Sequence, residues 1–290
     1  MKKTHRNTIF VENAEILSHQ SYAAGQFIMR VHAPECATHA QPGSFAHIQC
    51  DSRLPMRRPI SIMRVSKNAG WVDFLYKTEG QGTQLLATRK VGEKINILAP
   101  IGKPFRLPVE RTRPLLIGGG VGIPPMIFLA EHIHAMQDAY QALVLMGSEV
   151  PFPFKARPSE IIIDGIEEGV IACMPLLDDW NIPSRLASLQ DYPGCYQGYV
   201  TDLARQWLQS LDDEQRQQVE IFACGPMPML EAVATLAREF DLPCQVSLEE
   251  YMACAVGGCA GCVVEVKTDA GPAMKRVCVD GPVFDADKVF

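Results

Sequence analysis

Four cysteines near the end of the chain have the residue type and spacing that metal chemistry requires. Cys254, Cys259 and Cys262 fall within nine residues, and Cys278 follows after a gap of 15 residues. The order C-x4-C-x2-C…C is typical of four thiolates that bind two bridged irons, although the gap to the last cysteine varies among families. The spacing therefore predicts a [2Fe–2S] cluster with these four cysteines as its metal ligands.

Glycines fill the space between these thiols: Gly257, Gly258 and Gly261. A loop that wraps a cluster needs unusual backbone angles, and cluster sulfurs accept hydrogen bonds from backbone N–H groups. Glycines provide both. A structural zinc site is the alternative, but zinc sites usually combine two C-x2-4-C pairs, whereas this chain has one C-x2-C and an isolated fourth cysteine.

A second candidate site is the stretch LLIGGGVGIPPM, in which a predicted strand at residues 115–117 runs into five residues with four glycines and then into a helix. A backbone without Cβ atoms approaches a pyrophosphate closely, and a helix N-terminus offers free N–H donors. Proline is tolerated in the first helical turn. The residues predicted to contact a nucleotide are Gly119, Gly120, Gly122 and Pro125. The alternative is a tight strand–helix turn that binds nothing.

Cys224, Gly225 and Pro226 follow another predicted strand, Val219–Ala223. The carboxyl ends of parallel strands are where such sheets bind ligands, so these three residues are predicted to lie at the same nucleotide site. The alternative for Cys224 is a small buried side chain before a turn.

Two stretches in the first third of the chain, MRRPISIM and LYKTEGQGT, form a third candidate site. Arg58 presents a fork of donors suited to a phosphate, and Ser61 offers a hydroxyl to a ring nitrogen. Gly80, Gly82 and Thr83 would let backbone amides meet a phosphate. Taken singly, an Arg-Pro pair is commonly a strand edge, and Gly-x-Gly-Thr is commonly a turn. The residues predicted to bind a cofactor here are Arg58, Pro59, Ile60, Ser61, Leu75, Tyr76, Lys77, Gly80, Gly82 and Thr83.

The elements that position these sites fall into three zones. Between residues 8 and 107, short β-type runs (QFIMRVHAP, FAHIQC, ISIMRVS, WVDFLYKT and KINILAP) predict a small antiparallel barrel or sandwich. After residues 111–114, strands alternate with helices, which predicts a parallel sheet in an α/β domain. The cysteine-rich tail is too small to bury a core without a staple. We expect domains at residues 1–108, 109–245 and 246–290.

Composition narrows the function. A net charge of −6 provides no basic surface for nucleic acid. The sequence contains neither an apolar run of membrane-span length nor a signal-peptide core, so the expected location is cytoplasmic. In a reducing compartment, ten cysteines are not a disulfide framework. Those outside the motifs are expected to be small hydrophobes: Cys36, Cys50, Cys173, Cys195 and Cys244.

The motif order R-P-x-S, G-x-G-T, G-G-G-x-G-x-x-P and C-G-P-x-P-M resembles the ferredoxin–NADP reductase superfamily over nearly the whole chain. The resemblance implies that the barrel holds FAD and the α/β domain holds NAD(P)H. It further implies that Arg58 contacts the FAD phosphates, Ser61 lies near flavin N5 and Cys224 lies close to the nicotinamide. In many members, the residue before that serine is aromatic and stacks on the flavin. This chain has Ile60 there, and Tyr76 is the candidate for stacking.

Glu149 bears on the choice between NADH and NADPH, because it follows the second α/β strand with no arginine beside it. A carboxylate at this point repels a 2′-phosphate and accepts a hydrogen bond from a 2′-hydroxyl. The sequence therefore favours NAD(H).

The tail, SLEEYMACAVGGCAGCVVEV followed by KRVCVDGPVF, resembles the electron-transfer subunits of NAD-dependent dihydroorotate dehydrogenases. This resemblance implies an electron relay in pyrimidine biosynthesis within a heterotetramer. An FMN-containing dihydroorotate dehydrogenase catalytic subunit is the implied partner, and no acid or base is expected in this chain. Tyr251 departs from the arginine common in that family. The GPVF tail is expected to lie at the docking surface, so that mutation of Phe284 weakens binding of the partner. The alternatives are a module that couples NAD(P)H to ferredoxin or a hydrogenase, and a nucleotide-binding regulator with a zinc-stapled tail.

Overall fold

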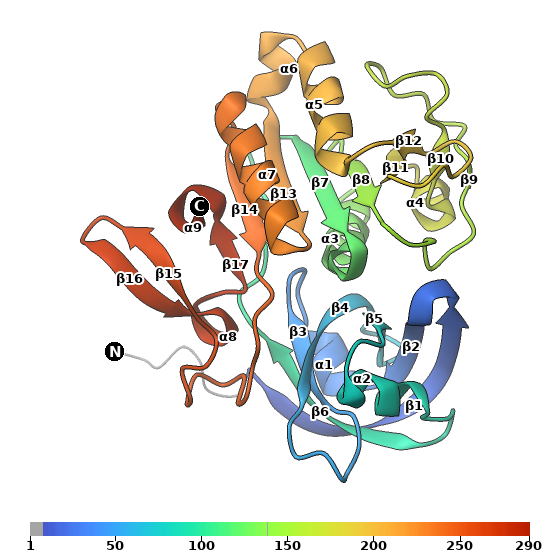
Figure 1. The fold of residues 1–290 in the computed structure, drawn as a ribbon, viewed down its shortest axis with the longest axis vertical. Coiled ribbons are helices and arrows are strands. Elements are labelled where there is room, and N and C mark those ends of the chain that lie inside the picture. The colour runs from blue at the N-terminus through green and yellow to red at the C-terminus, as the bar shows by residue number, and fades with distance from the viewer. Residues whose placement is uncertain (1–7, 138) are drawn as a thin grey trace.

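A computed structural model of the chain describes residues 8–137 and 139–290. Figure 1 shows three parts that follow one another along the chain: a β-barrel, a sheet with flanking helices, and a small C-terminal segment. The predicted fold class, an antiparallel barrel followed by an α/β sheet and a small C-terminal unit, is confirmed. No helix within these two ranges is long and apolar enough to cross a membrane.

The first part forms six antiparallel strands that close into a barrel. The strands are β1 (Phe10–Tyr22), β2 (Gln26–His32), β3 (Phe45–Gln49), β4 (Arg58–Ser66), β5 (Trp71–Lys77) and β6 (Lys94–Ile101). Their order around the barrel is β1-β2-β5-β4-β3-β6. The connections contain η1 (Ala23–Gly25), α1 (Pro34–His39) and α2 (Gln81–Ala87). The five predicted β-type runs are β2 to β6, and the pairing of β1 with β6 closes a barrel rather than a sandwich.

The barrel is filled because alternate residues along each strand point inward. Ile16, Met29 and Phe74, from three different strands, are fully buried in this core. The core is therefore apolar, and the polar residues predicted to bind a cofactor lie at its rim.

The second part is a seven-stranded sheet. Its strands are β7 (Arg113–Gly119), β8 (Leu143–Gly147), β11 (Ser184–Ser188), β12 (Tyr196–Gln197), β13 (Val219–Cys224), β14 (Cys244–Ser247) and β17 (Val283–Asp285). Their order is β12-β11-β8-β7-β13-β14-β17, and all neighbours are parallel except β14 and β17. The helices are η2 (Gly120–Gly122), α3 (Ile123–His134), α4 (Pro175–Asp179), α5 (Val200–Ser210), α6 (Asp213–Gln217) and α7 (Met227–Glu239). A short pair, β9 (Arg157–Pro158) and β10 (Ala172–Cys173), lies beside the sheet.

Both faces of this sheet are buried, as expected for parallel strands. Leu115 and Ile117 of β7 pack on the face covered by α5 and α7. Leu116, between them, packs on the opposite face against α3. Because α3 also packs against barrel strand β4, this helix lies between the two larger parts (Figure 1).

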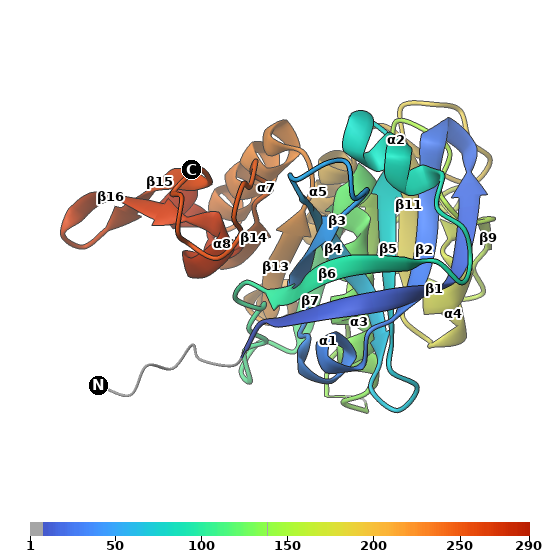
Figure 2. The same ribbon diagram turned by 90° about the horizontal axis from the view of Figure 1, so that it is seen from below.

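The C-terminal segment is made of a hairpin, β15 (Val263–Thr268) and β16 (Gly271–Arg276), and two short helices, α8 (Val277–Asp280) and α9 (Ala286–Val289). Figure 2 shows the hairpin projecting away from the barrel and the sheet. After the hairpin, the chain returns and β17 pairs antiparallel with β14 at the edge of the large sheet. The segment is therefore anchored by the neighbouring sheet rather than by a separate core.

Candidate functional site

A cavity of about 1130 Å³ lies between the barrel and the C-terminal segment. Nine of the ten residues predicted to bind a cofactor in the barrel line it: Arg58, Pro59, Ile60, Ser61, Leu75, Tyr76, Lys77, Gly80 and Thr83. Residues 247–253, Gly261 and Pro282 form the wall from the C-terminal side, and Val121 contributes from the glycine-rich turn. The fold thus brings all three predicted zones to one cavity.

Arg58 contributes a positive charge to the cavity wall. Its Nη1 donates to the backbone carbonyls of Met56 and Arg57, so these hydrogen bonds leave the charge without a neutralising carboxylate. Gly82, the one predicted barrel residue that does not line the cavity, lies behind it: a Cβ at Gly82 would be 2.8 Å from Arg58 Nε. Gly82 therefore makes room for the arginine, and Arg58 is suited to an anionic ligand.

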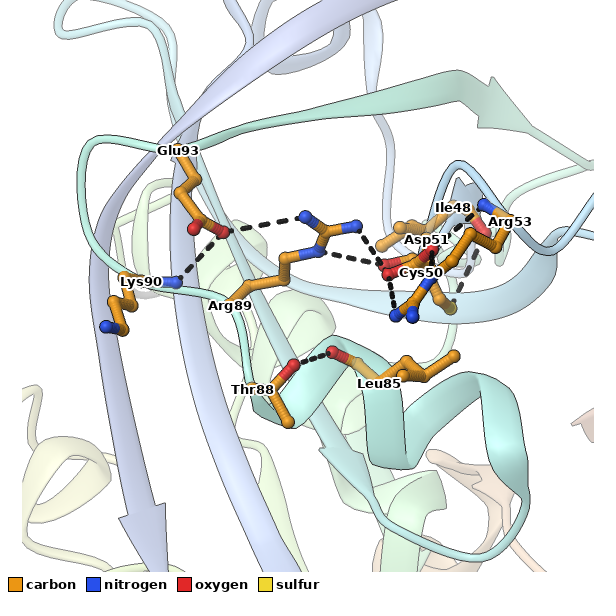
Figure 3. Close-up of polar contacts among 9 residues, drawn as sticks. All are labelled: Ile48, Cys50, Asp51, Arg53, Leu85, Thr88, Arg89, Lys90 and Glu93. Atoms are coloured by element: carbon orange, nitrogen blue, oxygen red, sulfur yellow. Dashed lines mark hydrogen bonds and ion pairs between the residues drawn. The ribbon is translucent and has the colours of Figure 1, made fainter.

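An ion-pair network holds the loop that leads to Arg58 (Figure 3). Asp51 accepts hydrogen bonds from Arg53 Nε at 2.8 Å and from Arg89 Nη2 at 3.0 Å. Arg89 Nε also donates to the Cys50 carbonyl. The hydrogen bond from the Arg53 guanidinium, followed by that from the Arg53 backbone N–H, holds the pKa of Asp51 well below its usual range. The network fastens the loop after β3, which leads to the cavity residues Met56 and Arg58, to the chain just after α2.

Tyr76 is fixed from inside the barrel. Its hydroxyl and His19 Nε2 are 2.7 Å apart, and its ring stacks on Phe27 with centroids 5.4 Å apart and planes 12° from parallel. Burial raises the pKa of Tyr76, so its hydroxyl remains protonated. Tyr76 lines the cavity with a defined orientation, and its role in stacking on a flavin stays a prediction.

The glycine-rich turn lies where β7 and β13, parallel neighbours, end side by side. A Cβ at Gly122 would lie 2.2 Å from the carbonyl oxygen of Cys224, and a Cβ at Gly119 would lie 2.4 Å from Met229 Sδ. Gly120 has φ +55° and would have no atom within 4 Å of an added Cβ. Gly122 therefore allows the two strand ends to pack, Gly119 makes room for Met229 of α7, and the space beside Gly120 is open.

The remaining residues predicted for the nucleotide site surround this turn. Pro125 is the third residue of α3 and is buried. Gly225 and Pro226 follow β13 and lead into α7, and a Cβ at Gly225 would meet Met229 Cε at 2.4 Å. Glu149 is exposed, two residues after β8. Cys224 is fully buried at the end of β13 and does not line the cavity. Contact of these residues with a nucleotide stays a prediction.

Glu249 lines the cavity but belongs to none of the sequence motifs that predict a site. Its side chain has access to water within the cavity. Burial against the surrounding protein, with repulsion from Glu79 as the second cause, raises the pKa of Glu249 to about 7. The charge of Glu249 also acts on the buried thiol of Cys224. The only sequence signal for this residue is its place in the S-L-E-E stretch before the cysteines.

The cysteine loop carries the hydrogen bonds that a sulfur cluster requires. The backbone N–H groups of Gly258 and Cys259 donate to Cys254 Sγ at 3.3 and 3.4 Å, and that of Gly261 donates to Cys259 Sγ at 3.4 Å. Although burial raises it, these and neighbouring N–H groups lower the pKa of Cys254 to about 7. The predicted role of Gly258 and Gly261 as donors near sulfur agrees with this geometry.

Backbone strain is concentrated in the same loop. Gly257 has φ +80°, as the predicted use of glycine requires, and its carbonyl accepts from Arg276 Nη1 at 3.0 Å. Ala255 and Ala260 also have positive φ values, +56° and +52°. Each such alanine costs on the order of 1 kcal/mol, which is typical of a loop shaped around a functional group.

The four cysteines lie close to one another, and the charge of Cys254 acts on Cys278. Cys254 is within hydrogen-bonding reach of Cys259, and Cys262 is within reach of Cys278. Burial and then the neighbouring Cys262 raise the pKa of Cys278 to about 12. Within the described ranges, no three His, Cys, Asp or Glu side chains surround one point closely enough for a single metal ion. Four neighbouring thiols and the sulfur-directed N–H groups agree with the predicted [2Fe–2S] site.

Comparison with known proteins agrees with this geometry. The model of the iron-sulfur cluster binding domain of dihydroorotate dehydrogenase B matches residues 249–290, which contain all four cysteines. The dihydroorotate dehydrogenase B (NAD(+)) electron transfer subunit of Desulforamulus reducens is 30% identical over 285 residues, 96% of this chain and 98% of that protein. The chain belongs to this family. The corresponding subunit of Caldanaerobacter subterraneus subsp. tengcongensis is 32% identical over 251 residues, 86% of this chain and 87% of that protein.

Solved structures place the dihydroorotate dehydrogenase B electron transfer subunit family within a wider fold. An NADH-dependent reduced ferredoxin-NADP oxidoreductase involved in flavin-based electron bifurcation has 25% identity and a TM-score of 0.76, with 96% of this chain and 90% of that chain covered. The ferredoxin reductase in carbazole 1,9a-dioxygenase has 19% identity and a TM-score of 0.59, with 80% and 65% covered. The predicted resemblance to ferredoxin–NADP reductases is confirmed at the level of the fold.

The prediction for Phe284 is wrong. Phe284 was placed at the docking surface, but its side chain is only 8% exposed and packs in the core of the large sheet. The reason is the pairing of β17 with β14, which sets Phe284 opposite Val246. Tyr251, which departs from the family pattern, is 93% exposed and lines the cavity.

Proposed function

We propose that this chain is the electron-transfer subunit of an NAD-dependent dihydroorotate dehydrogenase, acting in pyrimidine biosynthesis in the cytoplasm. Its partner is an FMN-containing catalytic subunit that oxidises dihydroorotate, with which it forms a heterotetramer. The proposed domains are residues 1–108 for FAD, 109–245 for NAD(H) and 246–290 for the cluster. When bound, FAD and the [2Fe–2S] cluster supply the exchange between one-electron and two-electron transfer that links the partner to NAD+.

The observation that carries this proposal is the composition of the cavity wall. Gly261 lies between two of the proposed cluster ligands, Cys259 and Cys262, and lines the same cavity as Arg58 and Ser61. A flavin nucleotide held there would touch the loop that carries the cluster ligands. Family membership over 96% of the chain supports the same assignment.

The chain's own residues would divide the work of binding. Arg58 would neutralise the FAD diphosphate, and Ser61 would donate to the flavin ring. Tyr76, held by His19 and Phe27, would offer a flat and immobile surface beside it. Lys77, Gly80 and Thr83 complete the barrel wall.

NAD(H) would bind across the ends of β7 and β13. The open backbone at Gly120 would approach its pyrophosphate, and the exposed carboxylate of Glu149 would accept from the ribose 2′-hydroxyl rather than admit a 2′-phosphate. Cys224 would lie near the nicotinamide as a protonated thiol.

The test is an anaerobic purification of the chain co-expressed with the FMN-containing subunit from the same source. We expect FAD and, as a [2Fe–2S] cluster requires, about two irons and about two acid-labile sulfides per chain. We also expect dihydroorotate-dependent reduction of NAD+. Cys259→Ser should abolish that relay and the cluster signal while NADH still reduces an artificial acceptor through the flavin. Zinc in place of iron, or equal loss of both activities, would contradict the proposal.

A second function, NADH-linked reduction of a ferredoxin, is favoured by the likeness to the NADH-dependent reduced ferredoxin-NADP oxidoreductase, at 25% identity over 96% of this chain. The same preparation separates the two functions. Rapid reduction of ferredoxin by NADH without the FMN-containing subunit, and no NAD+ reduction with dihydroorotate, would favour the second function.

A further inference from the structure

One barrel strand and one helix of the α/β part carry residues of both proposed cofactor sites. Strand β4 contains Arg58 and Ser61, and helix α3 follows directly after the glycine-rich turn, with Pro125 in its first turn. These two elements pack against each other. Their polar contact is an ion pair between Arg64 of β4 and Glu131 of α3.

The ion pair has the geometry of a directed contact. Arg64 Nε and Nη2 both donate to Glu131 Oε1, at 2.9 and 2.6 Å. The two side chains are only 22% and 23% exposed, so water screens the pair less than it screens a surface pair. Glu131 Oε2 is buried and has no hydrogen-bond partner among the described residues. Arg64 supplies the hydrogen bonds of this carboxylate, and Arg30 also acts on it through its charge, so removing Arg64 leaves a partly buried carboxylate without its hydrogen-bond donor.

Aromatic rings from both parts enclose the Arg64 guanidinium. Its Cζ lies 5.6 Å from the ring centroid of Trp71, at the start of β5, and 5.1 Å from that of Trp180, just after α4. Both distances are within the range of cation–π attraction. Trp180 is itself stacked on His134, the last residue of α3, with centroids 5.5 Å apart. Arg64 is therefore held by the barrel on one side and by the α/β part on the other.

A strand irregularity turns Arg64 toward α3. The register between β4 and β5 shifts between Ile62 and Arg64, which is the signature of a β-bulge. Ile62 points into the barrel core, whereas Met63 packs in the cluster that contains Met126 of α3. In the other direction, Phe128 of α3 packs into the barrel core. The contact between the two parts is thus interlocked, with the ion pair at its edge.

The ion pair lies at a similar distance from each proposed site. Arg64 is three residues beyond Ser61, about 10 Å along a strand. Glu131 is six residues beyond Pro125, about 9 Å along a helix. Because a strand within a barrel and a packed helix are both stiff over such lengths, a shift at the ion pair is transmitted to the distance between the two sites.

We propose that Arg64 and Glu131 are positioning residues that fix the nicotinamide-binding turn against the flavin-binding strand and so set the geometry of hydride transfer. This inference rests on the proposed function. Neither residue touches the cavity, and their effect is exerted through β4 and α3.

The test uses the complete FAD- and cluster-loaded protein with Glu131→Gln, Arg64→Met and the double variant. The matched control is Glu239→Gln, which removes the same charge from an ion pair with Arg205 that joins α5 and α7 within the α/β part. The measurement is anaerobic stopped-flow reduction of the flavin over a range of NADH concentrations, together with the long-wavelength charge-transfer absorbance of the NADH complex.

We expect Glu131→Gln and Arg64→Met each to lower the limiting rate of flavin reduction roughly tenfold, because small errors in the alignment of reacting atoms are costly. The apparent Kd for NADH and the FAD content should remain at the wild-type level, and the charge-transfer absorbance should weaken. The double variant should be no slower than either single variant, since both remove one contact. Glu239→Gln should match the wild type.

A second readout does not depend on turnover. Hydrogen exchange of residues 58–66 and 123–134 in the loaded protein should be faster in both single variants than in the wild type. Wild-type reduction rates in Glu131→Gln, unchanged exchange, or loss of FAD in both variants would overturn the inference. Absence of NADH-dependent flavin reduction in the wild type would instead contradict the proposed function, and the exchange experiment would still test the contact.

Discussion

Ser247 lies opposite Cys224 in the large sheet, where the parallel strands β14 and β13 end together. The Ser247 hydroxyl is within hydrogen-bonding reach of the Cys224 thiol. Burial first, and then the charge of Glu249, raise the pKa of Cys224 well above its usual value. A thiol held in this state is not a nucleophile, so any part that Cys224 takes in catalysis is through its shape and its position.

Cys224→Ala is therefore expected to slow flavin reduction by NADH about tenfold, because the nicotinamide would lose a packing surface that fixes its orientation. FAD content should not change. The matched control is Cys244→Ala, since Cys244 is a similarly buried cysteine at the opposite end of β14. Stopped-flow measurement of both variants decides the point, and equal rates in the two would remove Cys224 from the nicotinamide site.

Glu249 predicts a dependence of stability on pH. In the unfolded chain its carboxyl ionises near 4.5, whereas in the folded protein its pKa is about 7. Between these values the folded state keeps a proton that the unfolded state has lost, so the free energy of unfolding falls as pH rises from 4.5 to 7 and stays level above 7. Because the side chain has access to water, we discount the full shift to about 1 to 2 kcal/mol.

Chemical unfolding of the wild type and Glu249→Gln at pH 5, 6, 7 and 8 measures this effect. Glutamine has no proton to lose, so the variant should lack this contribution and gain stability relative to the wild type as pH rises. Glu250→Gln is a suitable control, since Glu250 is the next residue in the chain and lines the same cavity. Parallel pH profiles for the wild type and Glu249→Gln would show that Glu249 ionises normally in the folded protein.

Tyr251 is expected to contact the FMN-containing subunit. It is 93% exposed, lies three residues before Cys254, the first proposed cluster ligand, and is followed in the same loop by the exposed Cys259. Large exposed aromatic residues commonly act as anchors at protein interfaces. Tyr251→Ala should weaken binding of the partner roughly tenfold or more without loss of FAD or iron.

Surface plasmon resonance with the immobilised FMN-containing subunit measures this change. Ile162→Ala provides the control, because Ile162 is 88% exposed and lies in the α/β part. A partner affinity unaffected by Tyr251→Ala but reduced by Ile162→Ala would move the interface to the α/β part.

The helices and strands could be predicted from the sequence because each depends on a pattern of neighbouring residues. The β-type runs became barrel strands, and the helix predicted after the glycine-rich turn is α3. Contacts between segments that lie far apart in the sequence could not be predicted. Phe284 is buried because β17 returns to β14, and the short stretch GPVF contains no sign of that partner. Gly82 resembles a phosphate contact, but its neighbour is Arg58, whose position is fixed only by the fold.

The glycine-rich turn also combines a local sequence pattern with a contact between distant segments, and this contact gives a prediction. Gly122 is predicted to contact a nucleotide, and an added Cβ would in addition lie 2.2 Å from the Cys224 carbonyl oxygen, an atom of the neighbouring strand β13. Gly122→Ala should therefore lower the free energy of unfolding by about 3 kcal/mol and displace β13 from β7. NADH binding should be lost as well, because the backbone proposed to bind the pyrophosphate and the turn after Cys224 would separate.

Gly169→Ala is the control for this substitution, since no atom lies within 4 Å of a Cβ at Gly169 and its φ is not in the left-handed region. Its free energy of unfolding should stay within about 0.5 kcal/mol of the wild type. Urea unfolding and NADH titration of both variants separate packing from ligand contact. Gly122→Ala with normal stability but no NADH binding would assign Gly122 to the nucleotide directly, because the packing explanation requires both losses together.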